Sequence, residues 1–200
     1  MSRWYYTFSL LPFILTSPCR ANCLTDVVAV KSAVEATKSY REIQSIRDKD
    51  GTIKTLVLDF KGEDKLRFSY YEIWGDIRVG VIVGSRLWDR GNDGKLTENT
   101  TSSESGIAHG MIKGKRFNID TDVRKIKCST EKDDFGEKVE KFVWTQKERS
   151  FSIDFTLWSD KKSHLPVRET WNYKGRPDIA DSKATILFLF SNALTITEPD

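Results

Sequence analysis

The chain has 200 residues, with 32 lysines and arginines against 29 aspartates and glutamates, which gives a formal net charge of +3. Charges so evenly balanced, and interleaved along the chain, argue against a nucleic-acid-binding protein, because such proteins need a concentrated basic surface. The length fits a single domain that can bury a sizeable hydrophobic core.

The first 21 residues have the composition of a secretory signal peptide. Arg3 supplies a positive start, residues 4–15 are apolar and contain no acid, and Cys19 and Ala21 are small residues at the positions that a signal peptidase reads. The apolar run is shorter than the roughly 20 residues that span a bilayer. A buried helix is the alternative, and the two prolines of this segment argue against it. We predict cleavage near Ala21 and one mature domain, residues 22–200, with no transmembrane segment.

Cleavage near Ala21 leaves two cysteines, Cys23 and Cys128, in the mature chain. Exported proteins fold in an oxidising compartment, where two cysteines have one possible pairing. Two unpaired, buried thiols are the alternative. We expect a disulfide, and a loop of this size corresponds to a stabilisation of roughly 4–5 kcal/mol in chain-entropy models.

An amphipathic helix is predicted directly after the cleavage site. Thr25 can cap its first turn, and Asp26 complements the positive end of the helix dipole. Apolar residues recur at helical spacing at Val27, Val30 and Val34. We expect the helix to end near Tyr40 and a turn to follow at residues 49–51.

Beyond residue 50 the apolar period changes to two, which is the spacing of half-buried β-strands. The predicted strands span residues 53–60, 66–71, 77–83 and 86–89. Short turns separate them, including a two-residue hairpin turn at Gly84 and Ser85. Because parallel strands need long crossover connections, these closely spaced strands predict an antiparallel meander.

A long polar insertion follows the meander. Residues 90–106 are rich in glycine, asparagine, threonine and serine, and this composition predicts a loop. Short helices are predicted at residues 107–112 and 121–126. The whole insertion, residues 90–126, is long enough to form a lid or a binding loop.

Four more strands are predicted in the last third of the chain. They span residues 138–145, 151–157, 167–173 and 184–190. The last strand is apolar on both sides, with Ile186 and Phe188 facing one way and Leu187 and Leu189 the other. Such a strand indicates packing outside the sheet or a ligand inside it.

No set of residues predicts catalysis or metal binding. His109 and His164 lack a second ligand at metal-binding spacing. The sequence has no nucleophile-elbow motif, and the glycines of residues 75–84 are not followed by a helix, as a phosphate-binding loop requires. We therefore expect neither a metal nor a cofactor, and an enzyme that uses residues 90–126 is the least favoured hypothesis.

Apolar residues on the strands are the candidates for ligand binding. A curved sheet that its helices do not fill leaves a hollow, in which each buried methylene of an acyl chain gains about 0.8 kcal/mol. The candidate cavity residues are Phe68, Tyr70, Val79, Val81, Phe155, Trp171 and Phe188. Strand parity alone leaves open which face of the sheet lines the hollow.

Three short motifs, in this order, resemble a known family. Residues 64–68 read Asp-Lys-Leu-Arg-Phe, residues 83–88 read Val-Gly-Ser-Arg-Leu-Trp, and residues 157–169 contain Trp-Ser-Asp and Leu-Pro-Val-Arg. They are similar to motifs of the periplasmic lipoprotein-carrier (LolA-like) superfamily and its uncharacterised periplasmic relatives, with Ser159 and His164 in place of the usual isoleucine and glycine. The resemblance implies a curved antiparallel sheet that forms an incomplete β-barrel closed by one or more helices. It also implies an apolar cavity for acyl chains and no catalysis.

The leading hypothesis is a soluble periplasmic carrier, expected to be a monomer, that holds a lipid or a lipid-modified protein. The step from this fold to transport is an analogy with the family. The alternative is an exported interaction or structural module whose core is filled by its own side chains and which binds no ligand.

Overall fold

The computed structural model describes most of the chain from Cys23 onward. The described residues are 23–48, 50–71, 77–91, 93–99, 125–147, 149–175, 182–191 and 193–199. The predicted signal peptide and the predicted helix at residues 107–112 lie outside them.

One helix precedes eleven strands in the described part of the chain. The elements are α1 (Cys23–Ala36), β1 (Ser39–Arg47), β2 (Ile53–Lys61), β3 (Lys65–Tyr71), β4 (Ile77–Val83), β5 (Arg86–Arg90), β6 (Leu96–Asn99), β7 (Lys127–Lys132), β8 (Lys138–Lys147), β9 (Ser152–Asp160), β10 (Pro166–Lys174) and β11 (Lys183–Phe190). Each of the eight strands predicted from alternation is present, with ends shifted by three residues at most.

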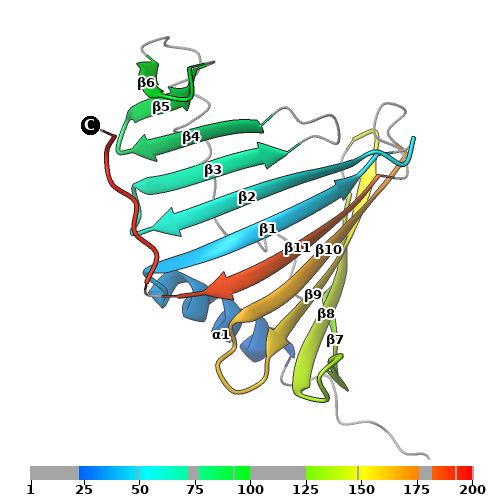
Figure 1. Cartoon of the computed structure of the whole chain (residues 1–200). Helices are drawn as coiled ribbons and strands as arrows, with labels where there is room; N and C mark the ends of the chain where they lie inside the picture. The colour runs from blue at the N-terminus through cyan, green and yellow to red at the C-terminus, as the bar shows by residue number, and fades with distance from the viewer. Residues whose placement is uncertain are drawn as a thin grey trace, which may run out of the picture.

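All the strands form one antiparallel sheet made of two meanders, in the order β6-β5-β4-β3-β2-β1-β11-β10-β9-β8-β7 (Figure 1). We call β1–β6 the N-terminal arm and β7–β11 the C-terminal arm. The arms join where β1 pairs with β11, with Tyr40 opposite Phe190 and Arg47 opposite Lys183. The outermost strands, β6 and β7, do not pair with each other, so the sheet is not closed. The predicted mostly-β fold, with an antiparallel sheet and a helix, is confirmed.

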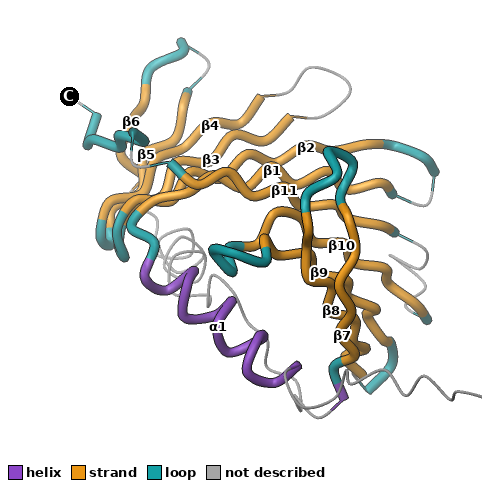
Figure 2. Tube along the Cα trace, turned by 90° about the horizontal axis from the view of Figure 1, so that it is seen from below, coloured by secondary structure: helices purple, strands orange, loops and turns teal. Residues whose placement is uncertain are grey.

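The helix lies against one side of the sheet, which we call the inner face (Figure 2). Two apolar clusters cover this face. The first lies mainly on the N-terminal arm and consists of Tyr40, Leu58, Phe60, Leu66, Ile82, Leu87, Ile186 and Phe188. The second joins Val27 and Val30 of α1 to Phe142, Trp144 and Leu157 of the C-terminal arm. Because side chains alternate along a strand, the residues between these positions point to the opposite, outer face.

The prediction that the helix continues to Tyr40 is wrong. The helix ends at Ala36, and Tyr40 is the second residue of β1, the central strand of the whole sheet. Alternation does not reveal β1, because its inner face carries Glu42 and Gln44 and its outer face carries Ile43. Pairing on both sides, with β2 and β11, fixes this segment as a strand in spite of its mixed polarity.

Two outermost strands were also not predicted. β6 lies within the segment expected to be a loop, and β7 follows directly after the helix expected at residues 121–126, of which 121–124 lie outside the described residues. Both strands are short and largely exposed. Polar edge strands of this kind carry no alternating apolar signal, since only one of their sides is paired.

Gly80 of β4 accommodates a ring from the neighbouring strand. The register of β3 and β4 places Phe68 directly opposite Gly80. A Cβ atom added at Gly80 would lie 2.2 Å from Cζ of Phe68. The Phe68 ring therefore occupies the space of a side chain at this position, which explains why the strand has a glycine here.

The turn between β9 and β10 places His164 in the left-handed region, with φ 59°. Asp160 organises the turn, because its Oδ1 accepts hydrogen bonds from the backbone N–H groups of Lys162 and Ser163. The left-handed region favours glycine, the residue that the family motif has here. The sequence therefore departs from the motif at the one position of this turn where a side chain is unfavourable.

Candidate functional site

The first apolar cluster is built around stacked aromatic rings. The Tyr40 ring lies 4.8 Å from that of Phe60 and 5.5 Å from that of Phe190, measured between centroids. The three residues occupy directly opposed positions on β2, β1 and β11, which is why their rings meet. This row continues through Leu66 and Ile82 and forms an apolar strip across the N-terminal arm.

A pocket of about 690 Å³ opens at the end of this strip, where the chain passes from α1 to β1. Its lining residues are Ala36, Thr37, Lys38, Ser39, Lys61, Leu165, Phe190 and Ser191. Phe190 belongs both to the pocket wall and to the aromatic stack, so the pocket lies beside the end of the apolar strip. The volume is in the range of roughly 300–1,000 Å³ that small-molecule sites have. Lys38 and Lys61 add positive charge to its lining.

The hydroxyl groups of the pocket are engaged with the backbone. Ser39 Oγ donates to the carbonyl oxygen of Ser191 at 2.5 Å, and Thr37 Oγ1 donates to that of Ala33 at 2.9 Å. Neither hydroxyl has a histidine or carboxylate partner that would activate it as a nucleophile.

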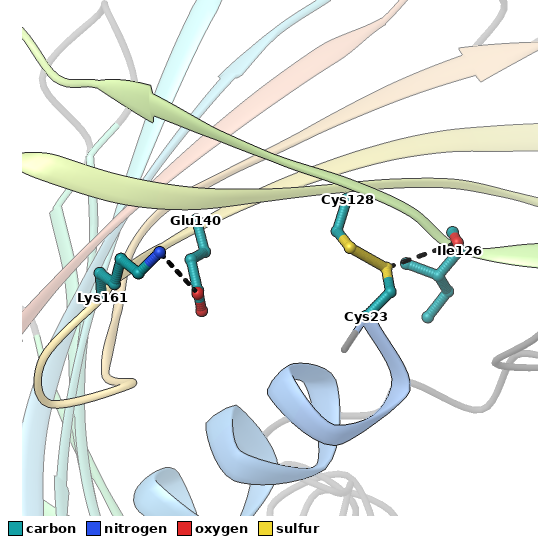
Figure 3. Close-up of a disulfide and its surroundings, with 5 residues drawn as sticks. All are labelled: Cys23, Ile126, Cys128, Glu140 and Lys161. Carbon is teal, nitrogen blue, oxygen red and sulfur yellow. Dashed lines mark hydrogen bonds and ion pairs between the residues drawn. A yellow bond between two sulfur atoms is a disulfide. The ribbon is translucent and has the colours of Figure 1, made fainter. Parts of the chain in front are cut away.

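A disulfide fixes α1 to the C-terminal arm. Cys23, the first residue of α1, is bonded to Cys128 of β7, across a separation of 105 residues (Figure 3). The Sγ atom of Cys23 also lies 3.6 Å from the carbonyl oxygen of Ile126. This bond confirms the predicted pairing of Cys23 with Cys128. Both cysteines pack in the second apolar cluster.

Two buried carboxyl groups lie on the inner face between the clusters. Burial raises the pKa of Glu169 to about 7, the Trp171 side chain partly offsets this, and Glu42 adds to the rise. Glu42 is also buried and accepts a hydrogen bond from Gln44 Nε2 at 2.9 Å. A carboxyl group with this pKa is largely protonated below pH 7 and can then donate a hydrogen bond in an apolar setting.

A third inner-face carboxyl, that of Glu140, points toward α1 (Figure 3). Its oxygens lie 3.9 Å from Nζ of Lys161 and 3.8 Å from Nδ1 of His164. Burial raises its pKa, Asp26 of α1 adds to the rise, and Lys161 and His164 partly offset it. This acid therefore contributes to the contact between α1 and the β9–β10 turn.

The seven candidate cavity residues divide between the two faces. Phe68, Tyr70, Phe155, Trp171 and Phe188 share the inner face, as the cross-strand pairs show. Val79 and Val81 lie on the outer face, because β4 pairs with β3 so that Gly80, not a valine, is opposite Phe68. The prediction that Val79 and Val81 share a face with the other five residues is therefore wrong.

Several features of the site were missed from the sequence. Tyr40 was assigned to the helix, and Phe190 was not among the candidate cavity residues. The sequence did not indicate that Glu169 is buried, because an acid between Arg168 and Thr170 in an alternating strand is expected to be exposed.

Among the described residues no group of histidine, cysteine and acidic side chains could hold a metal ion. The same residues contain no helix of the length and apolarity that crossing a membrane requires.

Comparison with solved structures identifies the fold. The structure is similar to that of the Mycobacterium tuberculosis lipoprotein LppX, with a TM-score of 0.59 and 13% identity over 88% of this chain and 98% of that chain. The chain shares the LppX fold. This similarity covers most of the chain at low identity, and it confirms the predicted resemblance at the level of the fold.

Two further structures are similar at lower scores. They are an uncharacterized conserved protein from Thermus thermophilus (TM-score 0.49, 11% identity, 86% of this chain and 88% of that chain) and a LolA superfamily protein from Nitrosomonas europaea (TM-score 0.36, 12% identity, 88% and 97%). No protein-family model and no curated protein sequence matches the chain.

Proposed function

We propose that the protein is a periplasmic carrier that binds a lipid, or the acyl chains of a lipid-modified protein, on the inner face of its half-barrel. The observation that carries the proposal is that Phe190 belongs both to the wall of the pocket and to the aromatic stack of Tyr40 and Phe60. An acyl chain in the pocket would contact the Phe190 ring, and each methylene that it buries contributes about 0.8 kcal/mol.

The charges at the pocket suggest how the ligand is oriented. Lys38 and Lys61 line the pocket, whereas Glu42 and Glu169 lie buried on the inner face. A negatively charged headgroup is favoured beside the lysines and disfavoured beside the acids. The proposed orientation has the headgroup at the pocket mouth and the acyl chain directed toward Tyr40.

The likeness to LppX supports a shared fold, and the Cys23–Cys128 disulfide supports an oxidising compartment such as the periplasm. Because the pocket hydroxyls donate to backbone carbonyls, we propose binding without catalysis. Residues 22–200 would then act as one carrier domain.

Uptake of a fluorescent fatty acid tests the proposal. Leu165→Trp places a large ring in the pocket and is expected to weaken uptake at least tenfold, because the ring competes with the ligand for the same volume. Val167→Trp, two residues away at an exposed position, is the matched control and should leave uptake unchanged. Lys38→Gln should weaken binding of the fatty acid roughly two- to fivefold and leave that of its methyl ester unchanged.

Equal uptake by the Leu165 and Val167 variants would place the ligand elsewhere. A wild-type protein that takes up no fatty acid, and that yields no lipid on extraction, would instead indicate a module whose core is filled by its own side chains.

A further inference from the structure

Charges are segregated between the two faces of the three central strands, β1, β11 and β10. The basic residues of these strands all point outward, and they are Arg41, Arg47, Arg168, Lys174 and Lys183. The two acids of these strands, Glu42 and Glu169, both point inward and are buried. The outer face of these three strands therefore carries five cations and no acid, while Asp59 and Asp154 of the neighbouring strands pair with Arg41 and Lys174.

Exposed apolar side chains lie among these cations. Leu187 and Leu189 of β11 point outward and are 43% and 51% exposed. Cross-strand pairs place Arg168 and Ile43 beside Leu187, and Arg41 beside Leu189. Since β11 lies between β1 and β10, the two leucines occupy the middle of the basic region.

An aromatic residue extends the same surface across β9. Trp158 lies opposite Arg168, whose guanidinium carbon is 4.1 Å from the ring centroid. Nζ of Lys141 lies 5.4 Å from the same ring, and the indole N–H donates to Glu131. Such a tryptophan, held between cations, has the amphipathic character of residues found at membrane interfaces.

The other flank of the leucines carries a pair of arginines. Arg41 Nε and Arg67 Nη2 contact the two carboxylate oxygens of Asp59 at 2.5 and 2.7 Å. One buried acid thus holds two partly exposed guanidinium groups side by side, which leaves this flank with an excess positive charge. Both guanidinium groups donate to Asp59 through Nε and Nη2, and their Nη1 groups are the donors that would meet a lipid phosphate.

We propose that this outer patch, formed by Leu187, Leu189, Arg41, Arg168 and Trp158, docks on the headgroup region of an anionic phospholipid bilayer. The arginines meet lipid phosphates, the tryptophan lies at the headgroup level, and the leucines enter the acyl boundary. Exposed leucines in the middle of the patch favour a lipid surface over a nucleic acid, whose backbone is bound through charge. Docking is separate from ligand binding, because the patch and the pocket have no residue in common.

Vesicle flotation of the full mature chain tests the proposal. We expect binding to vesicles of phosphatidylcholine with 30% phosphatidylglycerol, roughly tenfold or greater loss of binding on raising the salt to 0.5 M, and little binding to phosphatidylcholine alone. The double variant Leu187→Ser with Leu189→Ser should bind roughly tenfold more weakly. The double variant Arg168→Gln with Lys183→Gln should also lose roughly tenfold or more, since each cation near an anionic surface is worth about fivefold.

Matched controls separate the patch from general hydrophobicity and from the pocket. Val28→Ser and Phe135→Ser remove other exposed apolar residues, 53% and 91% exposed, and should bind vesicles like the wild type. The pocket variant Leu165→Trp should also dock normally. Circular dichroism and thermal melting of each variant verify that it is folded.

Three results would overturn the proposal. They are equal binding to neutral and anionic vesicles, equal binding by patch and control variants, and binding of DNA or an acidic protein without binding of vesicles. Copurified lipid in a chain that fails to dock would reject the membrane patch and leave the carrier function standing.

Discussion

The C-terminal arm of the sheet buries its inner face under α1, whereas the N-terminal arm buries its own with stacked aromatic rings. The helix is held on the C-terminal arm by a disulfide and by the contacts of Val27 and Val30. The pocket lies where the two arms join, since its wall includes Ser39 of β1 and Phe190 of β11. We infer a division in which the C-terminal arm holds the helix and the N-terminal arm is stabilised by its own aromatic packing.

Removing the disulfide should have the largest effect on this division. Cys23→Ser with Cys128→Ser is expected to lower the free energy of unfolding by about 3–5 kcal/mol, because the closed loop spans 105 residues. Urea denaturation measures the loss. Hydrogen exchange should show that amides of α1 lose protection before those of β1–β3, and uniform loss across both arms would contradict the proposed division.

Glu169 sits where the two arms meet and should make stability depend on pH. Its folded pKa of about 7 lies above its ordinary value of 4.5, so the folded protein binds this proton more tightly than the unfolded chain. Stability from this group is complete below about pH 4.5, declines as the pH rises toward 7, and is constant above. The difference corresponds to about 3 kcal/mol.

Glu169→Gln tests this dependence. The variant should exceed the wild type in stability at pH 8 and match it near pH 4.5, as measured by urea denaturation across that range. Glu137→Gln, at an exposed position, should retain the wild-type profile. Identical profiles for Glu169→Gln and the wild type would show that Glu169 is not a buried, proton-binding group.

Gly80→Ala probes the packing of the N-terminal arm alone. The new Cβ would lie 2.2 Å from the Phe68 ring and must displace it, at a cost of about 1–3 kcal/mol. Thermal unfolding measures the loss. Phe68→Ala with Gly80→Ala should show less than the sum of the two single effects, and strict additivity would argue against contact between the two positions.

The smallest effect is expected at the β9–β10 turn. His164→Gly should stabilise the protein by up to about 1 kcal/mol, because glycine adopts a φ of 59° without strain. Denaturant midpoints compared with those of Lys162→Gly, at an exposed turn position, provide the check. A loss of stability would mean that the contact of His164 with Glu140 outweighs the backbone strain.

Strict alternation made the fold partly predictable. The strands that contain Leu56, Leu58 and Phe60, or Phe155 and Leu157, follow a clear period of two. β1 was missed because its buried positions include Glu42 and Gln44, whose burial depends on partners distant in the chain. The cysteine pairing was predictable, since the two cysteines that remain after the predicted cleavage allow one bond.

The site was less predictable, because it depends on register between strands. Val79 and Val81 were assigned to the cavity because alternation within β4 shows which residues share a face but not which face of β4 matches the inner face of β3. The register of the two strands settles this, since it places Gly80 opposite Phe68. Overall composition also concealed the basic outer patch. Its cations are balanced in number by acids elsewhere in the chain, and only the fold shows that Glu42 and Glu169 turn inward while Arg41 and Arg168 turn outward.

The central claim is that an acyl ligand occupies the pocket beside Phe190, where the two arms join. Native mass spectrometry of the mature protein, purified without detergent from an envelope extract, tests it most directly. The account predicts a bound mass that organic extraction identifies as lipid, present in the wild type and in Val167→Trp and absent from Leu165→Trp. The bare polypeptide mass in all three proteins would contradict it.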